Sequence, residues 1–199
     1  LLLLWLPVSA LALTGQNYST FEAYYKDDIS YINENTGRHL LPKDLSMLDL
    51  GDNGRVQYAY YDDALNVTVA VDAAGIIETC EIRLLIAEGM VYGNSLYLDF
   101  ITAWYHSYAF IMAMHMSSEV SGRYLLVQEI SKALEDNSGF YKRQLGSYTV
   151  SCTRVIGEGA VFTFTNNGLA PAATDEPSGA PVQEDSPVEV DEDEAANYG

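Results

Sequence analysis

The spacing of apolar residues near the start of the chain predicts an amphipathic helix over residues 20–36. Four apolar residues recur at intervals of three and four, which places them on one helical face: Phe21, Tyr25, Ile29 and Ile32. Ser19 and Glu22 have the spacing of a capping box, which would begin the helix here. Gly37 then fits the left-handed position that commonly ends a helix.

Between residues 46 and 85 the hydrophobic period changes to two, which is typical of strands. Apolar and polar residues alternate over 67–71 and 76–85, and the turn residues 51–54 are expected to join two further strands, over 46–50 and 55–61. The sequence Gly51-Asp52-Asn53-Gly54 favours a tight hairpin turn, because Asn-Gly tolerates positive φ. The pattern predicts an antiparallel meander with one apolar face.

Residues 95–117 are almost uniformly apolar, as in a buried central helix. A membrane-spanning helix is the alternative, but Asp99, His106 and His115 make it unfavourable. A further helix is expected over 122–137, followed by a hairpin near 148–165. The fold class is therefore predicted as α+β, with the order α-β-β-β-β-α-α-β-β. It would hold an antiparallel sheet of five or six strands, covered on one face by helices.

The two ends of the chain differ from this central part in composition. Residues 1–12 form an apolar run that ends in Ala10-Leu11-Ala12, a pattern after which signal peptidase cleaves. Residues 167–199 contain nine acidic residues, no basic residue and four of the six prolines, so a disordered acidic tail is expected. We expect 1–12 to be a signal-peptide remnant, 13–166 a single domain, and the protein to be secreted by a bacterium.

Charge and cysteine content narrow the possible partners. A formal net charge of -18 argues against binding to nucleic acid or to an anionic membrane surface. The only two cysteines are Cys80 and Cys152, and outside the cytoplasm such a pair is expected to form a disulfide. Two unlinked buried thiols are the alternative.

Motifs with a known chemistry are absent, so we lean against an enzyme and expect no metal or cofactor. Residues 49–54 have the spacing of the start of a calcium loop, but Tyr60 stands where a bidentate Glu is needed. The best catalytic candidates are Asp99 and His106, which are seven residues apart and on one face of the predicted central helix. They are separated by about 10 Å along the axis, too far for a direct hydrogen bond unless the side chains lean together.

Tyrosine is the most distinctive residue type, with 15 copies in the chain. Tyr58, Tyr60 and Tyr61 lie on one predicted strand, and Tyr24 and Tyr25 on the first helix. Exposed tyrosines suit contact with a protein or a surface polymer, whereas packing at the edge of the core is the alternative. The sequence thus predicts a secreted, non-catalytic binding module. A small hydrolase that uses Asp99 and His106, or a structural domain of an envelope assembly, remain as alternatives.

Overall fold

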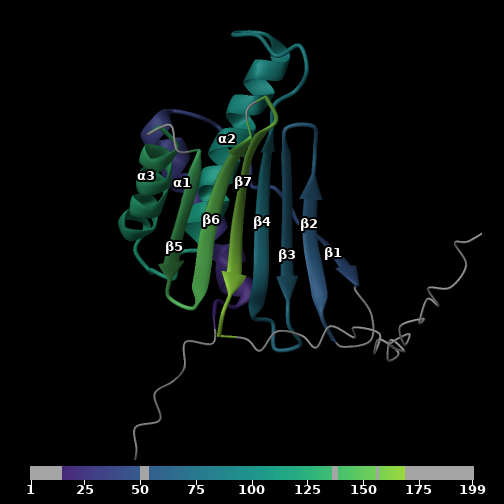
Figure 1. Cartoon of the computed structure of the whole chain (residues 1–199), viewed down its shortest axis with the longest axis vertical. Helices are drawn as coiled ribbons and strands as arrows, with labels where there is room; N and C mark the ends of the chain where they lie inside the picture. The colour runs from purple at the N-terminus through teal and green to yellow at the C-terminus, as the bar shows by residue number, and fades with distance from the viewer. Residues whose placement is uncertain (1–14, 50–53, 136–138, 156, 169–199) are drawn as a thin grey trace, which may run out of the picture.

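Figure 1 shows a computed structural model that describes residues 15–49, 54–135, 139–155 and 157–168. Its centre is one antiparallel sheet in the order β1-β2-β3-β4-β7-β6-β5. The strands are β1 (Ser46–Asp49), β2 (Val56–Tyr61), β3 (Leu65–Val71), β4 (Ile77–Leu85), β5 (Phe140–Leu145), β6 (Tyr148–Val155) and β7 (Gly159–Asn166). The helices are α1 (Tyr18–Thr36), α2 (Ser95–Ala113) and α3 (Val120–Glu135), all on one face of the sheet.

The predicted α+β class and antiparallel sheet are confirmed, but the sheet has seven strands instead of five or six. The additional strand is β5, an edge strand that pairs only with β6. Tyr141 is the only buried residue of β5, so the strand lacks the alternation of buried and partly exposed residues seen in β3 and β7. The expected leader and most of the expected tail and of the turn at 51–54 lie outside the described residues.

The two faces of the sheet differ in chemistry, and the difference places the core. At one level of the sheet a row of buried side chains faces the helices: Val69, Cys80, Phe164 and Val150. The adjoining row on the opposite face is polar and partly exposed: Thr68, Glu81, Thr163 and Ser151. The core therefore lies between the sheet and the helices, as expected for an antiparallel sheet with one solvated face.

Helix α1 begins at Tyr18, two residues earlier than the sequence pattern predicts. Asn17 is the N-cap, and its side-chain oxygen accepts a hydrogen bond from the Ser19 backbone N–H at 2.9 Å. The predicted cap at Ser19 is therefore wrong, because the stronger Asx acceptor two residues earlier takes this role. The end of the helix is as predicted, with Gly37 in the left-handed conformation at φ 67°.

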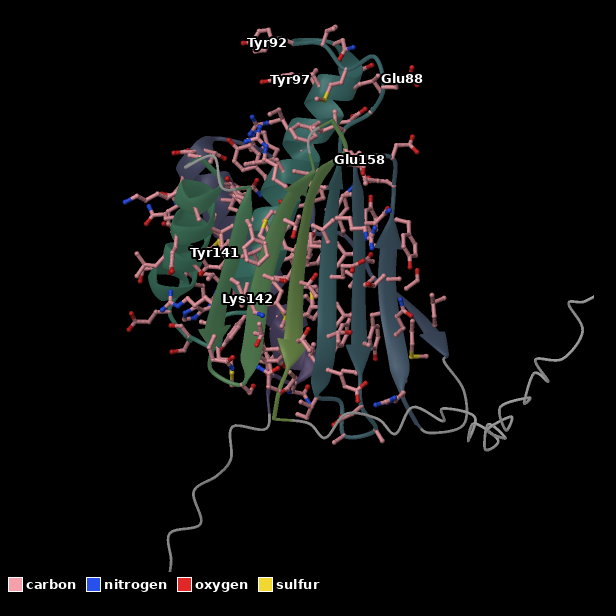
Figure 2. The ribbon with its side chains drawn as sticks, in the orientation of Figure 1. Glu88, Tyr92, Tyr97, Tyr141, Lys142 and Glu158 are labelled. Carbon is pink, nitrogen blue, oxygen red and sulfur yellow. The ribbon has the colours of Figure 1, made fainter. Side chains whose placement is uncertain are left out.

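The N-terminal end of helix α2 is exposed to solvent, and its C-terminal end is buried in the core. Residues 109–114, at its C-terminal end, are fully buried. The other end extends past the edge of the sheet, where Figure 2 shows Tyr92 and Tyr97 beyond the strands. Among the described residues, none of the helices combines the length and apolar character needed to cross a bilayer.

The predicted disulfide is not formed, because Cys80 and Cys152 are both free and buried. Cys80 lies opposite Phe164 on β7, and Cys152 lies opposite Phe162 on the same strand. Strand β7 therefore separates the two cysteines. Two strand spacings amount to about 10 Å, which is longer than the Cα–Cα separation that a disulfide can bridge.

A buried ion pair joins α1 to α3. The side chains of Asp28 and Arg123 are both 0% exposed, and Arg123 Nη2 donates to Asp28 Oδ1 at 2.7 Å. Arg123 Nη1 also donates to the carbonyls of Ser117 and Ser118, and the guanidinium lies 4.3 Å from the centre of the Tyr24 ring. These contacts satisfy a charge that would otherwise be costly to bury.

Candidate functional site

Two cavities lie on either side of α2, near the C-terminal end of β4. The first, here called the aromatic cleft, has a volume of about 340 Å³. Its principal lining residues are Leu84, Phe100, Trp104, Ser131, Glu135 and Arg154. The second, here called the polar cavity, has a volume of about 190 Å³. Its principal lining residues are Lys43, Asp62, Asp63, Asp99, Thr102 and His106.

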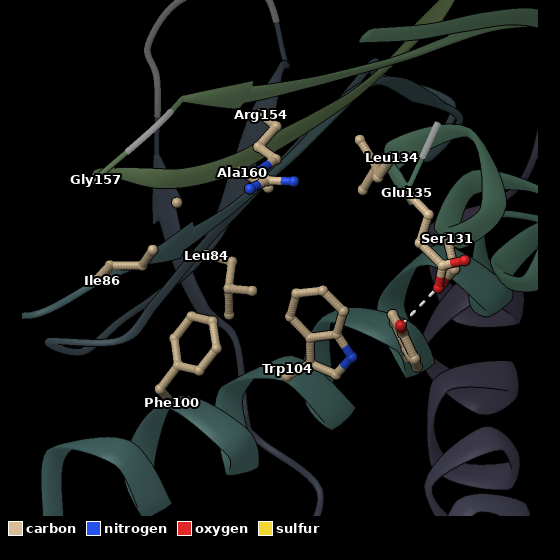
Figure 3. Close-up of a pocket in the computed structure, with 12 residues that line it drawn as sticks. Leu84, Ile86, Phe100, Trp104, Ser131, Leu134, Glu135, Arg154, Gly157 and Ala160 are labelled. Atoms are coloured by element: carbon tan, nitrogen blue, oxygen red, sulfur yellow. Dashed lines mark hydrogen bonds between the residues drawn. The ribbon is translucent and has the colours of Figure 1, made fainter. Parts of the chain in front are cut away.

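One wall of the aromatic cleft comes from three aromatic residues of α2. Phe100, Trp104 and Tyr108 follow one another at intervals of four, which places them on the same helical face. The Phe100 and Trp104 ring centres are 6.0 Å apart, and those of Trp104 and Tyr108 are 5.3 Å apart, with tilted planes. Leu84 and Ala160 from β4 and β7 form the facing wall (Figure 3). The result is a mostly apolar cavity in the size range of small-ligand sites.

Polar groups are placed at the margin of the aromatic cleft. The Tyr108 and Ser131 hydroxyls are 3.0 Å apart and share a hydrogen bond. Arg154 continues the helix-facing side of β6 beyond the buried Cys152, so its side chain extends toward the cleft (Figure 3). Within the described part of the chain, its guanidinium forms no ion pair, although Glu135 lies across the cleft. Arg154 is thus available to an anionic group of a ligand.

A glycine lets β7 pass close to β4 at the bottom of this cleft. Gly159 has φ 121°, a conformation that residues with a Cβ rarely adopt. A Cβ at this position would also collide with the Leu84 carbonyl oxygen. Glycine is therefore required where the turn between β6 and β7 borders the cleft.

The polar cavity brings together Asp99 and His106, the two residues that the hydrolase hypothesis pairs. They approach from the same helix, and no hydrogen bond joins them in the part of the chain that is described. Opposite them, Lys43 Nζ donates to the Tyr60 hydroxyl at 2.7 Å. That hydroxyl donates to Asp62 Oδ2 at 2.5 Å, and the other carboxylate oxygen accepts the backbone N–H groups of residues 64 and 65. This side of the cavity is therefore rigidly hydrogen-bonded.

The chemistry of His106 is set by burial and by Tyr25. The His106 side chain is only 1% exposed, and burial, with a smaller contribution from the Lys43 ammonium, lowers its pKa to about 4. Its Nδ1 lies 2.9 Å from the Tyr25 hydroxyl oxygen, which already accepts the backbone N–H of Lys43 at 2.9 Å. Nδ1 is the acceptor that the described structure places within reach of the Tyr25 O–H, so we assign this hydroxyl as the donor to Nδ1 and the proton of the neutral imidazole to Nε2.

This protonation state bears directly on the hydrolase hypothesis. A general base needs a free lone pair directed at its substrate. In His106 the lone pair of Nδ1 is occupied by Tyr25, and Nε2 is a donor. Asp99 has an exposed side chain and forms no hydrogen bond with His106 in the described structure. The arrangement is better suited to hydrogen bonding than to proton transfer.

The tyrosines of the predicted binding surface do not come together on one face. On β2, Tyr58 stacks on Tyr18 at a centroid distance of 3.6 Å, and Tyr60 joins the polar cavity network. Tyr61, by contrast, is 59% exposed.

On α1, Tyr25 is fully buried and stacks on Phe110 at 3.9 Å. Tyr24 is partly buried and packs against the Arg123 guanidinium. Four of the five tyrosines therefore make internal contacts, and one offers a largely exposed ring.

The sequence analysis did not identify the aromatic cleft, although the spacing of its lining residues is visible in the sequence. The spacing of Phe100, Trp104 and Tyr108 predicts that they share one face of the helix. Arg154 is two residues after Cys152, so both lie on the same face of β6. Neither signal reveals whether the space between the elements is filled. In the described part of the chain, no group of three or more His, Cys, Asp or Glu side chains could hold a metal ion.

Comparison of the chain with protein-family models, with curated proteins and with solved structures found no match. The function is therefore inferred from the geometry of the two cavities.

Proposed function

We propose that this protein is a non-catalytic binding protein, exported by a bacterium, whose aromatic cleft takes an apolar ligand with an anionic group. The observation that carries this proposal is the cleft itself: a cavity of about 340 Å³ with an aromatic wall and an Arg154 guanidinium that has no ion-pair partner in the described structure. Apolar walls with a few polar groups at defined positions are the usual composition of ligand sites.

The energetics favour a ligand of this kind. Transfer of apolar surface from water contributes about 25 cal/mol per Å², so filling the space beside Phe100 and Trp104 is favourable. The guanidinium of Arg154 can form two parallel hydrogen bonds with a carboxylate or sulfonate. The anionic group would thereby orient the apolar body in the cleft.

Trp104 provides a direct measurement of ligand entry. The chain has two tryptophans, and Trp5 lies in the segment that we propose is removed on export, so Trp104 is the only tryptophan of a chain that begins near Leu13. Two naphthalene probes separate the apolar and anionic contributions: neutral N-phenyl-1-naphthylamine and anionic 8-anilinonaphthalene-1-sulfonate. Both are expected to quench Trp104 by energy transfer.

Three variants test which contacts matter. Phe100→Ala removes apolar contact and is expected to weaken both probes about tenfold, equivalent to about 1.4 kcal/mol. Arg154→Gln is expected to weaken only the anionic probe. Leu125→Ser is the control, because Leu125 is 63% exposed on α3 and does not line the cleft. Equal effects of Phe100→Ala and Leu125→Ser would contradict binding in the cleft.

The export part of the proposal depends on residues 1–12, which lie outside the described residues. Mass spectrometry of the protein from its native compartment should find a chain that begins near Leu13. An intact leader on a cytosolic protein would contradict export and leave the cleft experiment unaffected.

A further inference from the structure

The polar cavity contains a hydrogen-bond donor for which the described residues provide no acceptor. The Nε2–H of His106 has no acceptor among the described residues, because the only hydrogen bond of this ring is the one between Nδ1 and Tyr25. His106 lines the polar cavity, and its Nδ1 side is held by Tyr25, which leaves the Nε2 side of the ring for a ligand.

Acceptors for a ligand lie around the same cavity. Asp63 and Asp99 have exposed carboxylates for which the described structure shows no hydrogen bond or ion pair. Asp62 is held in place by Tyr60 and by the backbone of the turn between β2 and β3. Lys43 Nζ, 3.7 Å from Asp62, adds a second donor beside His106. A ligand here meets donors and acceptors at close range.

The mixture of groups restricts the chemistry of the ligand. Three carboxylates and one ammonium give this cavity a negative charge, which disfavours phosphate or carboxylate ligands. A cation would be attracted by the carboxylates but would face the Nε2–H donor and the Lys43 ammonium. A hydroxyl group both donates and accepts, so a neutral ligand with several hydroxyls can satisfy both kinds of group.

We propose that the polar cavity binds a neutral polyhydroxylated unit, such as one sugar residue, with His106 Nε2–H donating to a ligand oxygen and Asp99 accepting from ligand hydroxyls. The volume of about 190 Å³ accommodates a unit of this size. This inference is independent of the aromatic cleft, because the two cavities lie on opposite sides of α2 and share no lining residue.

The three histidines make the proposal measurable by NMR. Long-range proton–nitrogen spectra resolve the ring nitrogens of His39, His106 and His115. Titration of the full-length protein with methyl glucoside, methyl galactoside, N-acetylglucosamine and inositol is expected to shift the His106 nitrogens for at least one of them. The dissociation constant is expected to be on the order of 1–10 mM, as for a small site with few contacts. His115, which does not line the cavity, should not shift.

Matched ligands and variants complete the experiment. Glucuronate, which adds a carboxylate to a sugar ring, is expected to bind at least tenfold more weakly than the neutral sugar. Asp99→Asn retains the shape of an exposed side chain and is expected to weaken binding about threefold to tenfold, since a charged acceptor is replaced by a neutral one. Glu34→Gln is the control, because Glu34 is an exposed carboxylate of α1 that does not line the cavity.

Three results would overturn the proposal. The first is the lack of any His106 shift with all four neutral probes. The second is a stronger shift with methylammonium chloride than with any sugar, which would identify an amine site. The third is an equal loss of affinity in Asp99→Asn and Glu34→Gln, which would indicate a general charge effect.

Discussion

Burial of a neutral His106 predicts a specific dependence of stability on pH. In the unfolded chain this histidine has an ordinary pKa of 6.5, whereas burial lowers the pKa to about 4 in the folded protein. Between these two values the unfolded chain binds a proton that the folded protein does not. The contribution of His106 to stability is therefore complete above the unfolded pKa and is lost as the pH falls through the folded pKa.

The magnitude follows from the size of the shift. One pKa unit corresponds to 1.36 kcal/mol, so the free energy of unfolding is expected to lose about 2–3 kcal/mol between neutral pH and about pH 4.5 through His106 alone. The charged neighbours act in opposite directions, since Lys43 lowers the pKa of His106 and Asp62 raises it. Asp28 also titrates in this range, because burial raises its pKa to about 6, and its effect on stability has the opposite sign.

A comparison with His106→Asn separates this effect from the others. The asparagine oxygen can replace Nδ1 as the acceptor for Tyr25, but the side chain does not titrate. Urea unfolding of both proteins, followed by far-ultraviolet circular dichroism, gives the difference in unfolding free energy at each pH. This difference is expected to shrink by about 2–3 kcal/mol as the pH falls from neutral to about 4.5. A difference that stays constant over this range would refute a neutral, buried His106.

Two further predictions concern the core. Arg123→Ala is expected to lower the unfolding free energy by about 3–5 kcal/mol, because it leaves Asp28 buried without its partner. Lys26→Ala, which removes an exposed ion pair, should cost less than about 1 kcal/mol. Urea denaturation measures both losses, and similar values would contradict the role of the buried pair. The thiols of Cys80 and Cys152 should both react with a thiol reagent after unfolding in urea without reductant, while remaining protected in the folded protein. Burial raises the pKa of both thiols, that of Cys152 to about 12, so little thiolate is present at neutral pH. A mass that shows the loss of two hydrogens would instead indicate a disulfide.

The sequence pattern was sufficient for the elements whose residues alternate between core and solvent. Strand β3 has buried and partly exposed residues in strict alternation, and it was predicted from this pattern. Strand β5 was missed because it lies at the edge of the sheet and most of its side chains are exposed, including that of Lys142 (Figure 2). Its sequence therefore shows no regular alternation of apolar and polar residues.

The order of the strands and the sites depends on contacts between distant parts of the chain. Alternation correctly placed Cys80 and Cys152 on the apolar side of their strands, but it does not show that β7 lies between them. Likewise, the role of His106 depends on Tyr25, which is 81 residues away in the sequence. Periodicity reports which face a residue occupies, whereas the partner on that face is determined by the tertiary fold.

The position of β7 also has a consequence for how the protein is made. Ile82 in the middle of β4 pairs with Phe162 of β7. The border of β4 that faces away from β3 is therefore paired by a strand synthesised near the end of the domain. Until that segment is available, the backbone N–H and C=O groups along one border of β4 have no native partner, and such borders readily pair with other chains. Nascent or truncated chains that end before Gly159 should therefore depend on a chaperone to avoid aggregation, whereas the complete domain closes this border itself.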